Sequence, residues 1–373
     1  MKVLILNPIL FTADNNVIPQ VKSIKDTMIY NMCLGFKRLG HDVTLAAAEE
    51  YAPAEKEAYD FEILFFKSDF KRIFPPAMLP FSPELWPYIK KNEKSFDLLI
   101  SSEVFSFQSL LAARICPEKT VIWQELTDHQ NKFHRLPSKI WHNVIVRLFM
   151  QRIAAVAPRS GPAYKFISKY MPQTVKQIVD HGINVDKFTY SEKKERQIIS
   201  SSQLILRKNI DGIIRIFQQF HEMEAYKDIK LLIAGRGEEE ANLKKLVSEL
   251  KLSESVRFLG FLPQQTLNKY IRESLCFLIN TRKDLNMVSI PESIVSGTPI
   301  LTNTQPASAN YIKTYKLGIV QNQWGIPELE EIINNNSFYV KNCIAYRDNL
   351  ANSHIAQTFL DIFQDKKIAE NIK

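Results

Sequence analysis

The sequence predicts an α/β fold made of two Rossmann-like halves with parallel sheets. Short apolar runs alternate with amphipathic segments along nearly the whole chain, a pattern typical of buried parallel strands joined by helices. A polar stretch at residues 191–197 divides this alternation into two runs of similar size, and neither run repeats the other in sequence. With 373 residues, the chain is long enough for two domains that each bury a core.

The first half begins with a predicted strand at residues 3–6 and a predicted helix at residues 20–39. Gly40 ends that helix and leads into the next strand. The strands expected in this half are at residues 3–6, 43–46, 61–66, 97–100, 120–123 and 153–156. A polar loop containing Asp14 follows the first strand in place of a G-x-G-x-x-G motif, which argues against a dinucleotide-dependent dehydrogenase.

The second half continues the same alternation. Strands are expected at residues 198–203, 229–234, 256–260, 275–280 and 300–303, with helices at residues 209–222 and 238–250. The run from residue 275 to 303 has the order strand, loop, helix and strand, which is a βαβ unit. In such units, ligands bind beyond the carboxyl ends of the strands, close to the starts of helices.

The composition is ordinary for a soluble globular protein, at 45% hydrophobic and 24% charged residues. Apolar runs stay well short of the ~18 to 20 residues that span a bilayer, and we expect the first residues to form a strand and not a signal peptide. Cys33, Cys116 and Cys276 lie inside apolar patterns and Cys343 is far from them, which favours reduced core thiols in a cytoplasmic protein. The cysteine and histidine spacings predict no metal site.

The formal charge of +8 suits an anionic partner, although many proteins show a similar surplus. Residues 66–81 and 141–152 both mix aromatic and cationic side chains. Such surfaces suit shallow membrane contact or a lipid-linked acceptor. The alternative is that the apolar side chains face the core while the cations face water.

Two carboxylates, Asp284 and Glu292, stand eight residues apart across the loop and the helix start of the βαβ unit. This placement predicts a nucleotide-sugar site. A structural explanation also exists, because Ser289 and Glu292 have the S-x-x-E spacing of a capping box, in which the glutamate satisfies backbone N–H groups. Both roles are compatible, since a carboxylate has two oxygens.

This segment resembles the E-x7-E region of the retaining GT-B glycosyltransferases of family 4, often called group 1. Glu292, Gly297 and Pro299 match the family pattern, and Asp284 stands in place of its first glutamate. The resemblance implies that Glu292 holds the ribose hydroxyls of the nucleotide and that Asp284 lies near the transferred sugar.

The residues that follow Asp284 depart from the family pattern, with Asn286 and Met287 in place of phenylalanine and glycine. By resemblance they still belong to the loop that faces the donor. We therefore expect Asn286, Met287 and Val288 to contribute to the donor site.

The first strand of the second half is followed by a stretch that resembles the family's G-R-L-x-x-x-K phrase. Lys208 matches the lysine, Gln203 replaces the arginine, and Arg207 is an adjacent cation. The resemblance implies that these residues face the donor diphosphate, where a preorganised cation stabilises the charge of the leaving group. Gly235 belongs to a G-x-G-x-E phrase, in which glycine serves either a tight turn or close approach to the donor.

In the first half, His129 follows Asp128 shortly after the strand at residues 120–123. The family often has a histidine near the reacting sugar at this place, which implies that His129 orients a donor hydroxyl or assists in deprotonating the acceptor. Glu125 is the alternative if the register shifts. A hydrogen-bonded surface histidine is the structural alternative.

The resemblance implies a GT-B architecture of two Rossmann-like lobes whose parallel sheets face across a cleft. The expected domains are an N-terminal acceptor-binding domain at residues 1–188, a C-terminal nucleotide-sugar-binding domain at residues 189–348 and a helix at residues 349–373 that returns to the N-terminal domain. The polar stretch at residues 191–197 and the preceding phrase from His181 to Phe188, which resembles a family motif, set this boundary.

The function implied is that of a hexosyltransferase that uses a nucleotide-diphosphate-sugar donor, retains the anomeric configuration, and needs no metal or other cofactor. The acceptor is a glycan or a lipid-linked glycan, as in cell-surface polysaccharide assembly. A nucleotide-sugar epimerase, an inverting GT-B enzyme and a non-catalytic GT-B partner subunit are the alternatives. We expect a cytoplasmic protein with peripheral contact at the inner membrane leaflet and no nucleic-acid partner, because the basic residues form no recognisable binding stripe.

Overall fold

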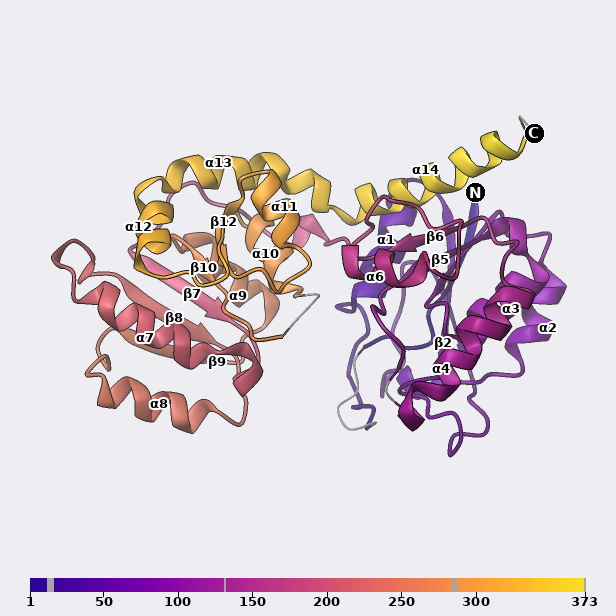
Figure 1. The fold of residues 1–373 in the computed structure, drawn as a ribbon, viewed down its shortest axis with the longest axis horizontal. Coiled ribbons are helices and arrows are strands. Elements are labelled where there is room, and N and C mark those ends of the chain that lie inside the picture. The colour runs from indigo at the N-terminus through magenta and orange to yellow at the C-terminus, as the bar shows by residue number, and fades with distance from the viewer. Residues whose placement is uncertain (12–16, 131, 284–286, 372–373) are drawn as a thin grey trace. The chain divides into compact units, whose positions relative to one another are not determined.

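The structure is a computed structural model that describes residues 1–11, 17–130, 132–283 and 287–371. It divides into two compact α/β units (Figure 1). The N-terminal unit comprises Met1–Ile183 and Ala351–Lys373, and the C-terminal unit comprises Asn184–Leu350. We describe each unit by itself.

The N-terminal unit is built on a six-stranded parallel sheet with the order β3-β2-β1-β4-β5-β6. The strands are β1 (Lys2–Leu6), β2 (Asp42–Ala48), β3 (Glu62–Phe66), β4 (Leu98–Ser102), β5 (Thr120–Gln124) and β6 (Ala155–Pro158). Val3 of β1 pairs with Val43 on one side and with Leu98 on the other. The strand order therefore reverses between β1 and β4, and such a switch point is where ligands bind in doubly wound sheets.

Helices cover both faces of this sheet. The α-helices are α1 (Met28–Arg38), α2 (Leu85–Asn92), α3 (Phe107–Ile115), α4 (Leu136–Ile140), α5 (Val146–Phe149), α6 (Gly161–Ile167) and α14 (Asn352–Asn371). Short 3-10 turns are η1 (Glu49–Tyr51), η2 (Pro117–Lys119) and η3 (Lys132–Arg135), and a π-helical turn, η4 (Trp141–Ile145), joins α4 to α5.

The helix α14 completes one face of the N-terminal sheet by packing along α1 (Figure 1). Phe359 and Phe363 of α14 belong to the core that α1 forms with the sheet, and Phe359 contacts the Trp123 ring edge-on at 5.8 Å. The start of α14 lies close to α1, where a Cβ atom added at Gly35 would come within 2.2 Å of the Asn352 carbonyl oxygen. The last helix is therefore an integral layer of this unit.

The C-terminal unit has its own six-stranded parallel sheet, ordered β12-β11-β10-β7-β8-β9. The strands are β7 (Gln197–Ser201), β8 (Lys230–Ala234), β9 (Val256–Gly260), β10 (Phe277–Leu278), β11 (Ile300–Thr302) and β12 (Gly318–Val320). Here the order reverses between β7 and β10, which creates a second switch point.

Its α-helices are α7 (Ile210–His221), α8 (Glu240–Glu249), α9 (Gln264–Glu273), α10 (Ser289–Val295), α11 (Ala309–Thr314), α12 (Ile326–Asn334) and α13 (Asn336–Tyr346). The 3-10 turns are η5 (Val185–Lys187), η6 (Leu206–Lys208), η7 (Glu224–Tyr226) and η8 (Arg347–Leu350). Residues of α7, α8 and α12 share one core with the sheet. The helices α9 and α10 pack against each other.

These two parallel sheets confirm the predicted α/β class. Two of the predicted elements are much shorter than expected. The helix expected at residues 20–39 begins only at Met28, because Thr27 caps it by accepting a hydrogen bond from the Tyr30 N–H. The strand expected at residues 275–280 shrinks to Phe277–Leu278.

All four cysteines are buried and unbridged. Among the helices of the described residues, none is both long and apolar enough to cross a bilayer.

Candidate functional site

A pocket of about 290 Å³ lies at the carboxyl edge of the N-terminal sheet. Its polar lining comes from residues that directly follow four neighbouring strands: Asn7 after β1, Glu103 after β4, Glu125 after β5 and Arg159 after β6. This is the switch point of the sheet, so the pocket occupies the place where a doubly wound fold binds its ligands.

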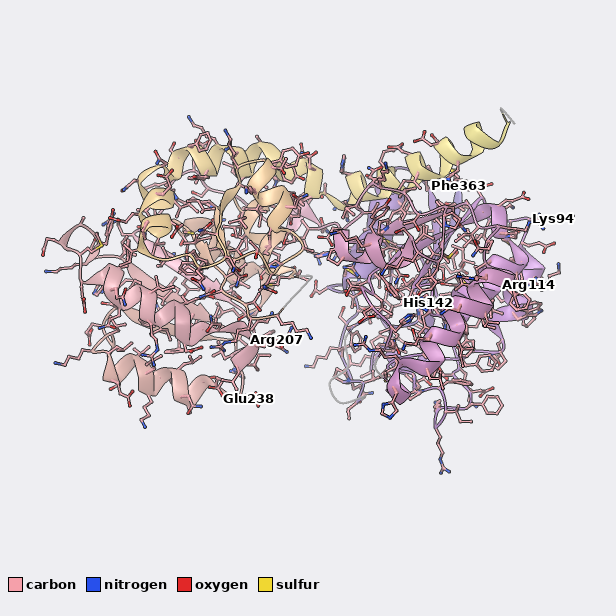
Figure 2. The ribbon with its side chains drawn as sticks, in the orientation of Figure 1. Lys94, Arg114, His142, Arg207, Glu238 and Phe363 are labelled. Atoms are coloured by element: carbon pink, nitrogen blue, oxygen red, sulfur yellow. The ribbon has the colours of Figure 1, made fainter. Side chains whose placement is uncertain are left out.

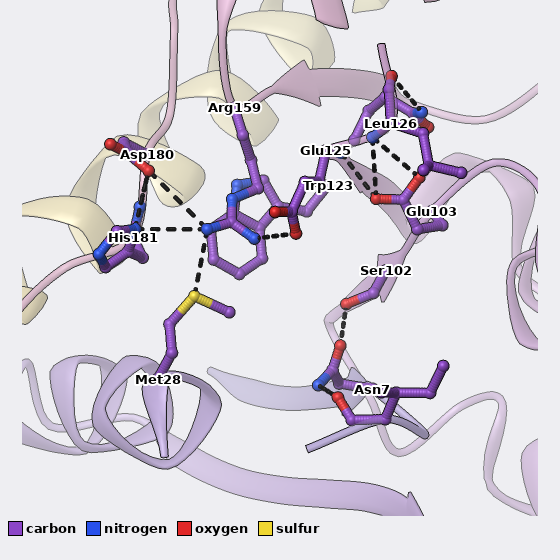
Figure 3. A network of polar contacts seen from close by, with 12 residues as sticks. Asn7, Met28, Ser102, Glu103, Trp123, Glu125, Leu126, Arg159, Asp180 and His181 are labelled. Atoms are coloured by element: carbon purple, nitrogen blue, oxygen red, sulfur yellow. Dashed lines mark hydrogen bonds and ion pairs between the residues drawn. The ribbon is translucent and has the colours of Figure 1, made fainter. Parts of the chain in front are cut away.

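Arg159 organises one wall of this pocket (Figure 3). Its guanidinium is only 5% exposed and donates to Glu125 Oε2 at 2.5 Å. It lies over the Trp123 ring at 4.5 Å, and its Nη2 atom is 3.8 Å from Asp180 Oδ1. Burial raises the pKa of Asp180, but the charge and hydrogen bonds of His181 and the charge of Arg159 outweigh this effect and leave the pKa lowered. The positive charge of Arg159 is therefore largely balanced within the protein.

Glu103 also lines this pocket. Its carboxylate accepts the backbone N–H groups of Glu125 at 2.7 Å and Leu126 at 3.3 Å (Figure 3). Burial and then the nearby charge of Glu125 raise the pKa of Glu103 to about 8, although the two backbone hydrogen bonds and Arg159 act in the opposite direction. Its φ of +66° lies in the left-handed region, which non-glycine residues seldom adopt. A side chain held this way at a ligand-binding edge is a candidate functional group.

The predicted residue His129 lies outside the lining of this pocket. Its two ring nitrogens are within 3.1 Å of the Ser138 and Tyr170 hydroxyls. Its ring packs edge-on against that of His142, a fully buried residue that is labelled in Figure 2. Burial lowers the pKa of His129. The alternative, Glu125, does line the pocket.

Sequence reasoning did not single out Asn7, Glu103 or Arg159. Each directly follows a strand, and the carboxyl ends of parallel strands share one edge of the sheet. That rule is the signal that places all three at one edge, although it does not tell which strands are neighbours.

In the C-terminal unit, a small hollow lies at the switch point between β7 and β10. Lys208 and Met287 line it, together with residues at and after the ends of the two strands, including Ser202 and Thr281. Lys208 ends the turn η6, and Asn209, with a φ of +56°, turns the chain into α7. The predicted cation therefore lies where a bound phosphate is expected in this kind of sheet.

The other two residues that were predicted to face the donor diphosphate lie at the surface. Gln203 and Arg207 are exposed, and Arg207 (Figure 2) donates from Nη1 to the Lys283 carbonyl at 3.2 Å. The Arg207 carbonyl accepts the Arg282 N–H at 2.8 Å. Arg207 thus holds the segment that follows β10.

Gly235 is required by close contact between two loops. Its φ is +129°, and an added Cβ atom would come within 1.8 Å of the Ser202 carbonyl oxygen. The Gly235 N–H already donates to the Gly260 carbonyl at 2.8 Å. The glycine therefore keeps the loops after β7 and β8 together.

Glu292 lies in α10 and is 9% exposed. The Gln264 amide donates to its Oε1 atom at 2.9 Å. The capping-box interpretation is wrong in its geometry, because Val288 is the N-cap and Ser289 is already the first helical residue. The described lining of the small hollow includes Lys208 but not Glu292.

Of the remaining donor-site candidates, Val288 is 47% exposed and Met287 is buried. Asp284 and Asn286 lie outside the described residues. Within the described residues, no group of three His, Cys, Asp or Glu side chains is placed to hold a metal ion.

Comparison with known proteins gives the chain a family context. Residues 184–335 match the family model described as glycosyl transferases group 1. The chain is 24% identical over 190 residues to the alpha-monoglucosyldiacylglycerol synthase of Streptococcus pneumoniae (strain ATCC BAA-255 / R6), covering 47% of this chain and 43% of the relative. It is 24% identical over 297 residues to the O-antigen biosynthesis glycosyltransferase WclY of Escherichia coli, and this match covers 74% of this chain and 77% of the relative.

Solved structures extend the likeness to the whole chain. HepE of Anabaena in complex with UDP superposes with a TM-score of 0.66 at 14% identity, over 98% of this chain and all of that one (100%). The apo form of the lipopolysaccharide outer core galactosyltransferase WaaB gives a TM-score of 0.67 at 12% identity, over 98% and 100%. The fold is therefore that of the GT-B glycosyltransferases. The chain spans about half the length of the first curated relatives it matches, at 43% and 49%.

Proposed function

We propose that this protein is a glycosyltransferase that moves a sugar from a nucleotide-diphosphate-sugar to a glycan or lipid-linked glycan acceptor. The observation that carries the proposal is Lys208, which lies in a hollow at the switch point of the C-terminal sheet, inside the segment that matches the group 1 model. A lysine there stabilises the charge that develops on the leaving diphosphate.

The donor assignment draws further support from the relatives, since HepE binds UDP in its solved structure. Glu292 is proposed to hold the ribose, and Asp284 to lie near the sugar. Retention of configuration and independence from metal ions are part of the same proposal and rest on the family-like motif around Glu292. In the N-terminal unit we place Glu125, rather than His129, near the reacting centre, because Glu125 lines the polar pocket.

The experiment is a donor screen with mass-spectrometric detection of released nucleotide and of glycosylated product. Lys208→Ala is expected to lower turnover by roughly 10²-fold or more, the loss typical of removing one preorganised charge-stabilising group, while Tm changes little. Lys245→Ala is the matched control, since Lys245 is 77% exposed in α8. Donor isomerisation without transfer, or equal losses of activity and stability in Lys208→Ala, contradicts the proposal.

We also propose that the N-terminal unit contacts an anionic membrane surface. Along the continuous helix of α4, η4 and α5, the side chains of Leu136, Ile140, Val144 and Leu148 are 58%, 51%, 46% and 67% exposed. A spacing of four drifts around an α-helix, and the wider π-turn at η4 offsets that drift, so the four side chains keep to one stripe. The alternative, that the apolar side chains of this segment face the core, holds only for the opposite face of the helix, where Trp141 and Val146 are buried.

Lys139 and Arg147 are exposed beside this stripe, which suits an anionic leaflet. Sedimentation with vesicles should show binding to anionic but much less to zwitterionic lipid, weakened by added salt. Ile140→Asp is expected to reduce that binding severalfold, and Ile178→Asp, at an isoleucine 44% exposed elsewhere in this unit, to leave it unchanged. Equal binding by both variants contradicts membrane contact at the stripe.

A further inference from the structure

The polar pocket of the N-terminal unit continues into a second, apolar pocket of about 170 Å³. Met78, Leu79, Phe105 and Gln130 line both pockets. The rest of the apolar pocket is lined by Ile73, Phe74, Pro75, Pro137 and Ser138. Apolar residues line much of both pockets, and the charged side chains of the combined site gather at the carboxyl edge of the sheet, away from residues 73–79. An amphiphilic ligand needs such an arrangement.

The apolar part is held open by packing. The Phe74 ring meets Phe107 edge-on at 4.9 Å, and Phe81 meets the same ring at 5.0 Å. The Gln108 amide donates to the Pro80 carbonyl at 3.1 Å, and the Asp69 N–H donates to the Phe81 carbonyl at 2.8 Å. These contacts fix residues 69–81 over α3, so the groove is formed before any ligand arrives.

The apolar pocket opens beside exposed apolar surface. Ile73 is 66% exposed and neighbouring Phe70 is 64% exposed. Pro137 links the groove to the start of α4, where the stripe of Leu136 and Ile140 begins. A hydrocarbon chain in the groove therefore has a continuous apolar route to the face proposed to meet the membrane.

The charged residues at the carboxyl edge of the sheet determine which head group an amphiphilic ligand can have. Glu125 and Asp180 place two carboxylates against the single positive charge of Arg159. A phosphate head would therefore meet net repulsion there. Hydroxyl groups suit this lining, because the Glu125 carboxylate accepts hydrogen bonds, and Glu103, whose pKa is raised to about 8, is largely protonated at neutral pH and can both accept and donate.

We propose that the two pockets together bind an amphiphilic acceptor, with an uncharged polyhydroxyl head against Glu103 and Glu125 and a hydrocarbon chain in the groove beside Ile73. This inference rests on the proposed glycosyltransferase function, for which it names the acceptor class. It excludes a free soluble glycan and a head group that is itself a phosphate.

The test uses calorimetry with alkyl β-glucosides below their micellar concentrations, without any donor. Affinity should rise about fourfold for each methylene added between hexyl and decyl glucoside, the effect of burying one CH₂ group. Methyl glucoside should bind at least a hundredfold more weakly than decyl glucoside, and decyl phosphate at least tenfold more weakly. Affinity that is independent of chain length, or decyl phosphate binding as tightly as the glucoside, would overturn the proposal.

Ile73→Asp locates the binding. It should weaken decyl glucoside binding at least fivefold, because a charge then faces the chain, and the exposure of Ile73 leaves the fold intact. Ile178→Asp is the matched control and should bind as the unaltered protein does. Equal effects of the two substitutions would overturn the assignment to the groove.

UDP binding, measured separately, distinguishes this inference from the proposed function. If UDP binds and no alkyl glucoside does, the acceptor class is wrong while the transferase remains. If decyl glucoside binds in the groove while no nucleotide diphosphate binds, the site is supported and the transferase function is lost.

Discussion

The raised pKa of Glu103 makes the stability of the folded protein depend on pH. Burial, followed by the charge of Glu125, raises its pKa from the ordinary value of 4.5 to about 8. Between these values the folded chain binds the proton more tightly than the unfolded chain, so the free energy of unfolding falls as the pH rises through this window.

Glu103→Gln is expected to remove this pH dependence. Relative to the unaltered protein, the variant should gain stability as the pH rises from 5 to 8, by roughly 1–2 kcal/mol after allowance for partial exposure. The substitution also alters the hydrogen bonds from the Glu125 and Leu126 N–H groups. Any loss of stability from that change is the same at pH 5 and pH 8, so it does not affect the difference between them. Chemical denaturation at several pH values measures the difference, and Glu118→Gln, with a side chain 72% exposed, is the control. A difference that stays constant with pH contradicts the raised pKa.

Glu292 tests the proposed donor site at the same scale. Glu292→Gln should weaken binding of a nucleotide diphosphate by roughly tenfold to a hundredfold, because a hydrogen bond to a charged group contributes about 1.5–3 kcal/mol. The fold should stay intact, since the amide can still accept from Gln264, whose side chain now donates to Glu292 at 2.9 Å. Calorimetry measures the affinity, with Glu249→Gln in the exposed Lys245 pair as the control. Unchanged affinity in Glu292→Gln counts against its role.

Helix packing between α1 and α14 depends on the absence of a side chain at Gly35. Gly35→Ala is expected to destabilise the N-terminal unit by roughly 2–3 kcal/mol and to lower its Tm by about 5–10 °C, because the new Cβ atom would lie 2.2 Å from the Asn352 carbonyl oxygen. Gly161→Ala is the matched control, since a Cβ atom there meets nothing within 4 Å. Calorimetric melting of both variants gives the comparison, and similar Tm values would show that the helices shift apart without cost.

The strands were predictable because each is a short apolar run that must be buried on both faces. Helix starts were harder, since residues 20–27 continue the composition of α1 without joining it, and only the cap at Thr27 marks the true start. The site was harder still. Lys208 belongs to a recognisable motif, whereas Glu103 and Arg159 can be assigned to one site only when the order of strands β4, β5 and β6 in the sheet is known. The spacing of residues in the sequence does not give that order.

The N-terminal unit is built from two segments that are far apart in the sequence. Residues 351–373 are grouped with Met1–Ile183, while Asn184–Leu350 form a separate core. Within the described residues, Phe359, Leu360 and Phe363 are buried with side chains of β1, β4 and β5. The stability of the N-terminal unit therefore depends on residues that follow the C-terminal unit in sequence.

Deletion of residues 351–373 should consequently unfold or loosen the N-terminal unit while the C-terminal unit stays folded. Phe359→Ala is the milder form of this test, with an expected loss of about 3–5 kcal/mol from a buried aromatic side chain. Hydrogen exchange detected by mass spectrometry would show faster exchange in β1, β4 and β5 and unchanged protection in β7 and β8. Phe338→Ala, at a phenylalanine 49% exposed in α13, is the control and should change neither unit. Equal loss of protection in both sheets would mean that the two units unfold as one, and that α14 stabilises the chain as a whole.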